Sequence, residues 1–277
     1  MKNLLKRIDY ALAGIYDASG LETVRKALCT ELLGIDALSF YTKEPLEPDS
    51  ERERLLEDAL RRLAGGEPLQ YVCGNTPFCG LSFRLDGRVL IPRPETGELV
   101  EWVLQNRQET GNLVDIGTGS GCIAVTLAHR LPGWSVEGWD ISPDALRLAA
   151  LNNELNGTDV TFRRVDILTN PQSDIKFDVI VSNPPYVTEG EKLDMEKRVL
   201  DYEPDLALFV PDDDPLLFYR AISRFASANL TAGGSLFFEI NPLFAHELVL
   251  MLESGGYHNI ELRKDLYGKE RMIKADT

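Results

Sequence analysis

The pattern of hydrophobic and polar positions divides the chain into a helical first part and a second part in which strands and helices alternate. From residue 4 to about residue 65, apolar residues recur three and four positions apart, which is the spacing of one helix face. The first such run consists of Leu4, Leu5, Ile8, Leu12 and Ile15. Gly65-Gly66 ends the last of these helices. The spacing predicts a small helical domain over residues 1–70.

Short β-like runs separated by glycines come next, and they predict a hairpin. Three glycines interrupt the segment between about residues 71 and 90. The segment that follows contains Pro92 and Pro94, which cannot lie in the interior of a helix or in a central strand. Residues 71–95 are therefore predicted to form a β-hairpin linker between two domains.

From residue 96 onward, short apolar strands alternate with amphipathic helical stretches, as in doubly wound α/β domains. Two late β-rich runs, His258–Arg263 and Arg271–Lys274, are expected to pair antiparallel at the edge of the sheet. The predicted fold is α/β, with a Rossmann-like doubly wound sheet over residues 96–277 joined by the hairpin linker to the small N-terminal helical domain. The other predicted strands are Asn112–Ile116, Ser135–Trp139, Val160–Arg164, Phe177–Ser182 and Gly234–Ile240.

Composition narrows the classes of function. The 277 residues include 29 Lys+Arg and 44 Asp+Glu, and the net charge of −15 repels polyanions, so free nucleic acid is not an expected partner. The four cysteines lack paired C-x-x-C spacing, so no metal site is expected and the thiols are expected to stay reduced. The first ten residues carry charges at Lys2, Lys6, Arg7 and Asp9 with no apolar signal-peptide region behind them, and no apolar stretch reaches the length of a membrane span. A cytoplasmic protein that acts as a monomer, without membrane association, is expected.

A glycine-rich turn marks one end of a candidate site. The strand Leu113–Ile116, which contains Asp115, leads into Gly117-Thr118-Gly119-Ser120-Gly121, and a helical stretch follows. Glycines let the backbone approach a ligand closely and adopt positive φ, and N–H groups at a helix start are free to face it. Asp115 and residues 117–121 are therefore candidate cofactor contacts. A tight strand-to-helix turn without a ligand would show the same pattern.

Acidic residues after the next two strands favour a nucleoside cofactor. Asp140, followed by Ile141, ends the strand after the glycine turn, where a carboxylate can accept hydrogen bonds from both ribose hydroxyls. A helix cap is the alternative role for Asp140, although Ser142 can serve that cap equally well. Asp166-Ile167-Leu168 follows the third strand and is expected to supply an acceptor for the adenine amino group and an apolar wall, with an ordinary loop as the alternative. NAD-dependent domains share these features, so they do not separate hydride transfer from methyl transfer.

The fourth strand supplies the distinguishing motif. Asp178–Ser182 leads directly into Asn183-Pro184-Pro185-Tyr186. The two prolines preset φ and present the Asn183 side chain and the Pro184 carbonyl as paired acceptors for a planar –NH2 group, on whose flat face Tyr186 is expected to stack. Asn183, Pro184 and Tyr186 are thus predicted catalytic residues, and all four residues are predicted to bind substrate. A Pro-Pro stop with Tyr186 in the core is the alternative.

These motifs resemble the class I methyltransferases with an N-P-P-Y signature, and more closely the bacterial release-factor glutamine methyltransferases, the HemK or PrmC family. The resemblance covers nearly the whole chain, although Gly97 and Val210–Asp214 depart from the family pattern. Its linker features are Gly66-Glu67-Pro68, Gln70-Tyr71, Gly74, Phe78, Gly80, Phe83 and Val89–Thr96. Its features after the catalytic loop are Tyr202-Glu203-Pro204, Ala207-Leu208 and Tyr219-Arg220.

The resemblance implies N5-methylation of the glutamine in the Gly-Gly-Gln loop of class I peptide chain release factors, which the helical domain would help to grip. It implies that Gly117–Gly121, Asp140 and Asn183 contact S-adenosylmethionine, that Leu168 lies beside the adenine, and that Asn183–Tyr186 hold the glutamine. A nucleic-acid adenine-N6 amino methyltransferase, which would flip its base out of a duplex, is the main alternative, and the net charge argues against it. A catalytically idle adapter and a dehydrogenase are the others, and the intact Asn183–Tyr186 motif argues against the adapter.

Overall fold

The computed structural model describes residues 1–42, 49–106 and 109–277, and their contacts form two compact units. Unit 1 comprises Met1–Thr76, Leu85–Gly87 and Glu196–Tyr202. Unit 2 comprises Pro77–Arg84, Arg88–Met195 and Glu203–Thr277. This grouping differs from the predicted domain boundaries in two respects. The hairpin is divided between the units, and a segment from within residues 96–277 belongs to the helical unit.

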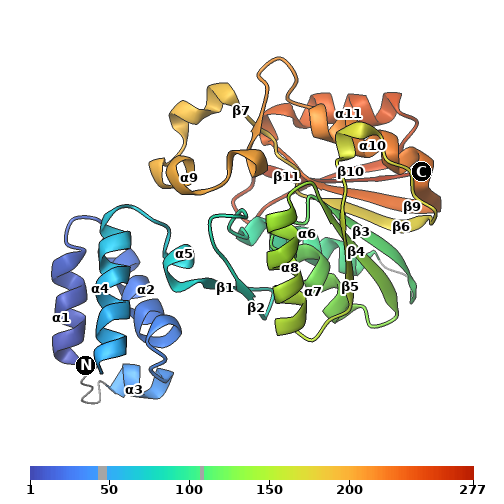
Figure 1. The fold of residues 1–277 in the computed structure, drawn as a ribbon. Coiled ribbons are helices and arrows are strands. Elements are labelled where there is room, and N and C mark those ends of the chain that lie inside the picture. The colour runs from blue at the N-terminus through green and yellow to red at the C-terminus, as the bar shows by residue number, and fades with distance from the viewer. Residues whose placement is uncertain (43–48, 107–108) are drawn as a thin grey trace. The chain divides into compact units, whose positions relative to one another are not determined.

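The helices of unit 1 that precede the hairpin pack around one apolar core, to which its last helix, α9, contributes no residue (Figure 1). Asp17 and Asp49 cap α2 and α4 by accepting hydrogen bonds from backbone N–H groups of the first turn. The core includes Leu4, Ile8 and Leu12, so the helical spacing is confirmed as far as Leu12, whereas Ile15 lies in the turn that follows and is 40% exposed. A π-helical turn, Leu28–Leu32, follows α2. The helices are α1 (Lys2–Ala11), α2 (Ala18–Ala27), α3 (Ala37–Thr42), α4 (Ser50–Ala64), α5 (Leu69–Cys73) and α9 (Lys197–Tyr202).

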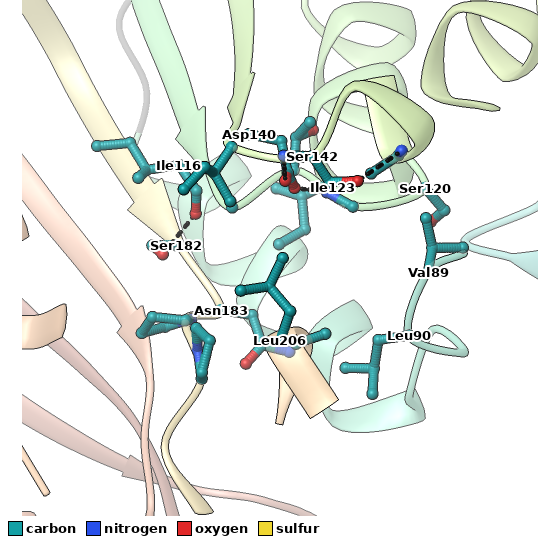
Figure 2. Close-up of a pocket in the computed structure, with 18 of the residues that line it drawn as sticks. Val89, Leu90, Ile116, Ser120, Ile123, Asp140, Ser142, Ser182, Asn183 and Leu206 are labelled. Atoms are coloured by element: carbon teal, nitrogen blue, oxygen red, sulfur yellow. Dashed lines mark hydrogen bonds between the residues drawn. The ribbon is translucent and has the colours of Figure 1, made fainter. Parts of the chain in front are cut away.

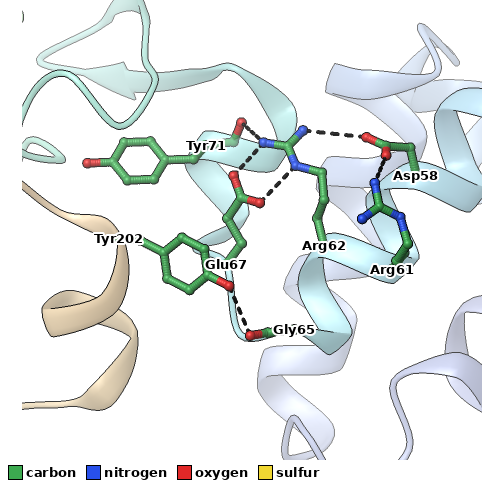
Figure 3. Close-up of polar contacts among 7 residues, drawn as sticks. All are labelled: Asp58, Arg61, Arg62, Gly65, Glu67, Tyr71 and Tyr202. Atoms are coloured by element: carbon green, nitrogen blue, oxygen red, sulfur yellow. Dashed lines mark hydrogen bonds and ion pairs between the residues drawn. The ribbon is translucent and has the colours of Figure 1, made fainter.

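Polar contacts hold the turn between α4 and α5 (Figure 3). Arg62 pairs with Glu67 through hydrogen bonds of 2.8 and 2.5 Å and donates a third, of 3.1 Å, to the Tyr71 carbonyl. Tyr202, the last residue of α9, donates its hydroxyl to the Gly65 carbonyl at 3.0 Å. A stretch of chain from beyond the predicted catalytic loop is therefore a structural part of the helical unit.

Unit 2 contains a seven-stranded sheet in the order β10-β11-β9-β6-β3-β4-β5. The strands β3, β4, β5, β6 and β9 are parallel, whereas β11 is antiparallel to both of its neighbours. Every predicted strand is present, and the two late runs form the expected antiparallel pair at the edge. The bounds are β3 (Gly111–Ile116), β4 (Trp134–Asp140), β5 (Val160–Arg164), β6 (Phe177–Ser182), β9 (Leu230–Glu239), β10 (His258–Lys264) and β11 (Glu270–Asp276).

Helices cover both faces of this sheet (Figure 1). Phe237 packs in one apolar core with Trp102, while its neighbour Phe238 packs in the other with Phe225, because successive strand residues point to opposite faces. The predicted double winding is confirmed. No helix within the described residues is long and apolar enough to cross a membrane. The helices on one face are α6 (Pro94–Gln105), α7 (Cys122–Arg130) and α8 (Pro143–Leu155), and those on the other are α10 (Leu217–Asn229) and α11 (Ala245–Ser254).

The predicted hairpin is formed by β1 (Asn75–Phe78) and β2 (Leu81–Arg84). Its aromatic residues Phe78 and Phe83 lie in one of the cores of unit 2, with ring centroids 6.0 Å apart. The Asn152 side chain bonds both backbone groups of Arg84, at 2.7 and 3.1 Å. The second half of the hairpin is thus anchored to the sheet unit.

The strand order reverses between β3 and β6. From there, β4 and β5 extend to one side and β9 to the other, and all of these strands are parallel. In open α/β sheets, ligands bind in the crevice beyond the carboxyl ends of the strands at such a reversal. The glycine turn after β3 and the Asn183-Pro184-Pro185-Tyr186 segment after β6 both follow strands at this point.

Candidate active site

A cavity of about 270 Å³ opens at the reversal point of the sheet (Figure 2). The loops after β3, β4, β5 and β6 line it, together with the segment before α6 and the segment after α9. Asp115, Gly121 and Tyr186 belong to the predicted site but lie outside this lining, although the structure describes them. The predicted site residues that line the cavity are Gly117–Ser120, Asp140, Ile141, Asp166–Leu168 and Asn183–Pro185.

The glycine turn uses the conformational freedom of its glycines. Gly117, Gly119 and Gly121 have φ of +75°, +53° and +80°, which side chains with a Cβ rarely adopt. The Gly117 N–H donates to the Trp139 carbonyl at 2.8 Å and so ties the turn to the end of β4. A Cβ at Gly121 would lie 3.1 Å from the Ala149 Cβ. Gly121 therefore allows α7 and α8 to pack, whereas Gly117 and Gly119 border the cavity.

Asp115 lies beneath the turn rather than in the cavity. Its fully buried carboxylate accepts hydrogen bonds from Thr118 Oγ1 at 2.6 Å and from the Ala124 N–H at 3.3 Å. Burial raises the pKa of Asp115 to about 7. The structure thus places this predicted cofactor contact where it ties β3 to the turn and to α7.

Asp140 is held by the backbone on both sides. Its Oδ2 accepts from the Gly119 N–H at 2.9 Å and its Oδ1 from the Ser142 N–H at 2.8 Å. A carboxylate has about four lone-pair positions, so two remain for a ligand. Burial raises the pKa of Asp140. The cap of α8 is Ser142, whose hydroxyl accepts from the Ala145 N–H at 3.2 Å, so the structure gives the capping role to that serine.

The loop after β5 presents Asp166 and the apolar residues Val165, Ile167 and Leu168 to the cavity. Asp166 Oδ1 accepts from the Leu168 N–H at 3.0 Å and starts the short 3-10 helix Ile167–Thr169. Ile167 is buried, whereas Leu168 is 46% exposed. Asp166 therefore both caps the short helix of this loop and lines the cavity.

Asn183 and Tyr186 are the first and last residues of the corner Asn183-Pro184-Pro185-Tyr186, and the side chain of each donates a hydrogen bond to another side chain of the protein. Asn183 Nδ2 donates to Thr96 Oγ1 at 3.3 Å, and the Tyr186 hydroxyl donates to Glu239 Oε1 at 3.1 Å. The Tyr186 ring packs partly against the core around α10. Its place outside the cavity lining agrees with the core alternative for its ring. The Asn183 oxygen, with Pro184 and Pro185, is left to face a ligand.

Two walls of the cavity come from segments that the sequence patterns did not assign to the site. The first runs into the first turn of α6 and supplies Arg88–Leu90, Pro92, Arg93 and, within α6 itself, Thr96. The second follows α9 and supplies Pro204, Leu206 and Ala207. Figure 2 shows Val89 and Leu90 on the first wall and Leu206 on the second. The family resemblance includes Val89–Thr96 and Tyr202-Glu203-Pro204, so it was the feature of the sequence that could have indicated these two walls.

Comparisons with known proteins match both parts of the chain. A family model for the PrmC N-terminal domain matches residues 3–74, and one for the methyltransferase small domain matches residues 96–202. The release factor glutamine methyltransferase of Bacteroides thetaiotaomicron is 43% identical over 277 residues, which cover 100% of both chains. That of Flavobacterium psychrophilum is 42% identical over 281 residues, covering 100% of this chain and 99% of its own. The chain belongs to the release factor glutamine methyltransferase family.

Solved structures agree with the fold of this release factor glutamine methyltransferase family member. A methyltransferase from Pyrococcus furiosus has a TM-score of 0.52 at 18% identity and covers 82% of this chain and 98% of its own. A 16S rRNA methyltransferase from T. thermophilus, in complex with AdoMet and guanosine, has a TM-score of 0.52 at 18% identity and covers 73% and 49%. At this identity the likeness concerns the fold alone, and it confirms the methyltransferase sheet.

The two departures from the pattern of release factor glutamine methyltransferases have local surroundings that suit them. A Cβ at Gly97 would lie 3.3 Å from Cys79 Sγ, a tight contact that the hairpin would have to relieve. Asp212, within the Val210–Asp214 departure, accepts a hydrogen bond from the Gly190 N–H at 2.8 Å. Neither group lines the cavity.

Proposed function

We propose that this protein transfers the methyl group of S-adenosylmethionine to the side-chain amide nitrogen, N5, of the glutamine in the Gly-Gly-Gln loop of class I peptide chain release factors. The observation that carries the proposal is the full-length similarity to release factor glutamine methyltransferases, at 43% identity. The position of Asn183-Pro184-Pro185 on the cavity supports it, because this corner suits a planar –NH2 group.

The lining of the cavity fits S-adenosylmethionine. The turn at Gly117 and Gly119 has the positive φ values and the open backbone that a closely approaching ligand needs. Asp140 would accept from the ribose hydroxyls with its two remaining lone-pair positions. Asp166 and Leu168 would supply an acceptor and an apolar surface for the adenine. When bound, S-adenosylmethionine supplies a methyl group that its sulfonium charge has already activated.

Asn183 and Pro184 would orient the glutamine amide. An amide nitrogen is a poor nucleophile because its lone pair is delocalised into the carbonyl, so alignment is the main task of the protein. Well-oriented reactants gain about 7–11 kcal/mol from proximity. The Asn183 oxygen would accept one N–H of the amide and the Pro184 carbonyl the other. Both acceptors would also stabilise positive charge that develops on the nitrogen.

Unit 1 would select the protein substrate. It contains the match to the PrmC N-terminal domain, and the proposed cofactor and amide contacts all lie in unit 2. α9, which follows Asn183–Tyr186 in the chain, also belongs to unit 1.

The test is incubation of the intact protein with methyl-labelled S-adenosylmethionine and a purified class I release factor, followed by peptide mass mapping. One methyl group on the glutamine of the Gly-Gly-Gln loop is expected. A release factor in which that glutamine is replaced by alanine is the matched control and should take up no label. Label on DNA or RNA, but none on the factor, would overturn the proposal in favour of the nucleic-acid alternative.

A further inference from the structure

Glu239 is a buried carboxylate at the end of β9 that joins two parts of the proposed site. Glu239 is only 2% exposed. Oε2 accepts from Thr96 Oγ1 at 2.6 Å, and Oε1 accepts from the Tyr186 hydroxyl at 3.1 Å. These donors come from α6 and from the loop after β6. A buried carboxylate is unfavourable unless it is hydrogen-bonded, so the two hydroxyls stabilise it and are fixed by it.

The Thr96 hydroxyl passes this orientation on to Asn183. A separation of 2.6 Å is typical of a hydroxyl that donates to an ionised carboxylate. A threonine hydroxyl has one proton, and once it points to Glu239 the oxygen can only accept from a third group. Asn183 Nδ2 is that group, at 3.3 Å. The amide nitrogen of Asn183 therefore faces Thr96, and its oxygen faces away from Thr96.

A flipped Asn183 amide would bring two acceptors together. Its oxygen would then face Thr96 Oγ1, whose proton is already donated to Glu239. That contact has no hydrogen to share, so the flipped state loses a hydrogen bond. It would also direct the –NH2 group of Asn183 towards the substrate amide, which needs an acceptor. The hydroxyl–carboxylate pair thus selects the productive state of the asparagine.

Tyr186, at the other end of the corner, is fixed at two points. Burial raises the pKa of Tyr186, and the nearby Glu239 charge raises it further, so the phenol stays protonated and donates. Asn241 Nδ2 donates to the Tyr186 carbonyl at 3.1 Å. Burial also raises the pKa of Glu239, an effect that its bonds from Thr96 and Tyr186 and the charge of Arg271 oppose.

We propose that Thr96 and Glu239 are positioning residues for methyl transfer: the carboxylate orients the Thr96 hydroxyl, which holds the Asn183 amide with its oxygen available to the substrate nitrogen. The inference rests on the proposed function, because it concerns the role given there to Asn183.

The first test compares Thr96→Val, Thr96→Ser and Glu239→Gln in single-turnover methylation of a release factor with saturating cofactor and substrate. Thr96→Val removes the hydroxyl and with it the bonds to Glu239 and from Asn183, so its rate should fall by about tenfold or more because the Asn183 amide is no longer held. The Kd for S-adenosylmethionine should stay within about threefold of wild type, because Thr96 is not among the residues proposed to hold the cofactor. Thr96→Ser keeps the hydroxyl and should restore the rate to within about threefold of wild type.

Glu239→Gln keeps the shape of the side chain but replaces one acceptor by a donor. If the new –NH2 group faces Thr96, the hydroxyl is free to donate to the Asn183 oxygen and the amide flips. The rate should again fall while folding is retained. This variant keeps the proposal testable if Thr96→Val does not fold.

Thr126→Val is the matched control. Thr126 in α7 is fully buried, and among the described residues its hydroxyl has no hydrogen-bond partner. The same chemical change in the same unit therefore removes no bond. Its methylation rate should stay within about twofold of wild type, and its unfolding temperature should not fall. A loss like that of Thr96→Val in this control would show that hydroxyl removal from a buried threonine is generally harmful, and would overturn the inference.

The double variant Thr96→Val/Asn183→Ala separates this inference from the proposed function. If Thr96 acts through Asn183, Thr96→Val should slow the Asn183→Ala protein far less than it slows wild type. Equal slowing in both backgrounds, or a wild-type rate for folded Thr96→Val and Glu239→Gln, would overturn the inference. A wild-type rate for Asn183→Ala would instead refute the role proposed for the asparagine. Failure of the wild-type protein to methylate the factor would refute the proposed function itself.

Discussion

The carboxylate of Glu203 lies 2.5 Å from Nη2 of Arg93, and the Glu203 side chain is 1% exposed. Its other oxygen accepts from the Ile91 N–H at 3.2 Å. Arg93 lines one wall of the cavity, and Pro204, which follows the glutamate, lines the other. This pair, of which the glutamate is buried and the arginine side chain is 34% exposed, therefore joins the two walls that the sequence patterns did not assign to the site.

Loss of Arg93 should destabilise unit 2 and loosen the cavity. Arg93→Ala leaves the buried Glu203 carboxylate without its cation, which we expect to lower the free energy of unfolding by about 2 kcal/mol. The control is Arg130→Ala, whose partner Glu101 is exposed, and it should lose less than about 1 kcal/mol. Urea unfolding of both variants checks this. Equal losses would show that burial of the Glu203 carboxylate is unimportant.

The sequence patterns predicted the sheet well because strand and helix periodicity are local. The strand ending in Asp140 and the turn Gly117–Gly121 could be recognised within a few residues of chain. Gly234–Ile240 was predicted too short, since β9 begins at Leu230. Gly233, with φ of +80°, lies where the pairing of β9 with β6 is irregular: Leu230 pairs with Phe177, and the next pair is Ser235 with Val179.

Contacts between distant segments could not be predicted from local pattern. Asp115 has the sequence position of a ligand contact, but Thr118 and Ala124 bond its carboxylate beneath the turn. Thr96 and Glu239 are 143 positions apart, and nothing in either segment indicates their bond. The membership of α9 in unit 1 likewise depends on packing and on the Tyr202–Gly65 bond. The sequence shows which side chains can form hydrogen bonds, but it does not show which distant residues they bond to.

Asp140→Ala should weaken cofactor binding. The variant removes the acceptor of two expected ribose bonds, each worth about 0.5–1.5 kcal/mol net, so the Kd for S-adenosylmethionine should rise roughly tenfold or more. It also frees the N–H groups of Gly119 and Ser142. Calorimetry on the intact protein measures the change. An unaltered Kd would remove Asp140 from the cofactor site.

Cofactor binding should also weaken at low pH. Burial raises the pKa of Asp140, so its carboxylate takes up a proton at a higher pH than an exposed aspartate, whose pKa is about 3.9. Since the protonated form has lost an acceptor, affinity should be full above the raised pKa and should fall as the pH drops through it. Titration of wild type and Asp140→Asn by calorimetry at several pH values checks the sign. The asparagine variant, which cannot titrate there, should lack this loss.

Gly138 in β4 allows the glycine turn to approach the sheet. A Cβ at this position would lie 2.7 Å from Phe162 Cε1 and 3.0 Å from Thr118 Oγ1. Gly138→Ala should therefore lower the free energy of unfolding by about 1–3 kcal/mol, as overpacking does. In the control Gly87→Ala, the added Cβ would meet the Tyr202 carbonyl at an ordinary 3.5 Å. Thermal unfolding of the two variants should separate them clearly; similar melting temperatures would argue against the close approach.

Removal of unit 1 should separate cofactor binding from substrate selection, and the hairpin decides where the chain can be cut. A chain that starts near Ile91 would lose Phe78 and Phe83, which lie in a core of unit 2, and the backbone bonds of Arg84 to Asn152. A chain that starts at Pro77 keeps all three. We therefore expect the Pro77 chain to fold better than the Ile91 chain.

The Pro77 chain should bind S-adenosylmethionine with nearly unchanged affinity, because every residue of the cavity lining lies in unit 2. It should lose most of its activity on an intact release factor, because it lacks the helices proposed to select that substrate. Its α9 would also lose Gly65 as the acceptor of the Tyr202 hydroxyl, so the full-length variant Tyr202→Phe is the matched control for that bond alone. The measurement is kcat/KM on the intact factor beside the Kd for the cofactor. A folded Pro77 chain that methylates the factor as efficiently as the full-length protein would show that unit 1 does not select the substrate.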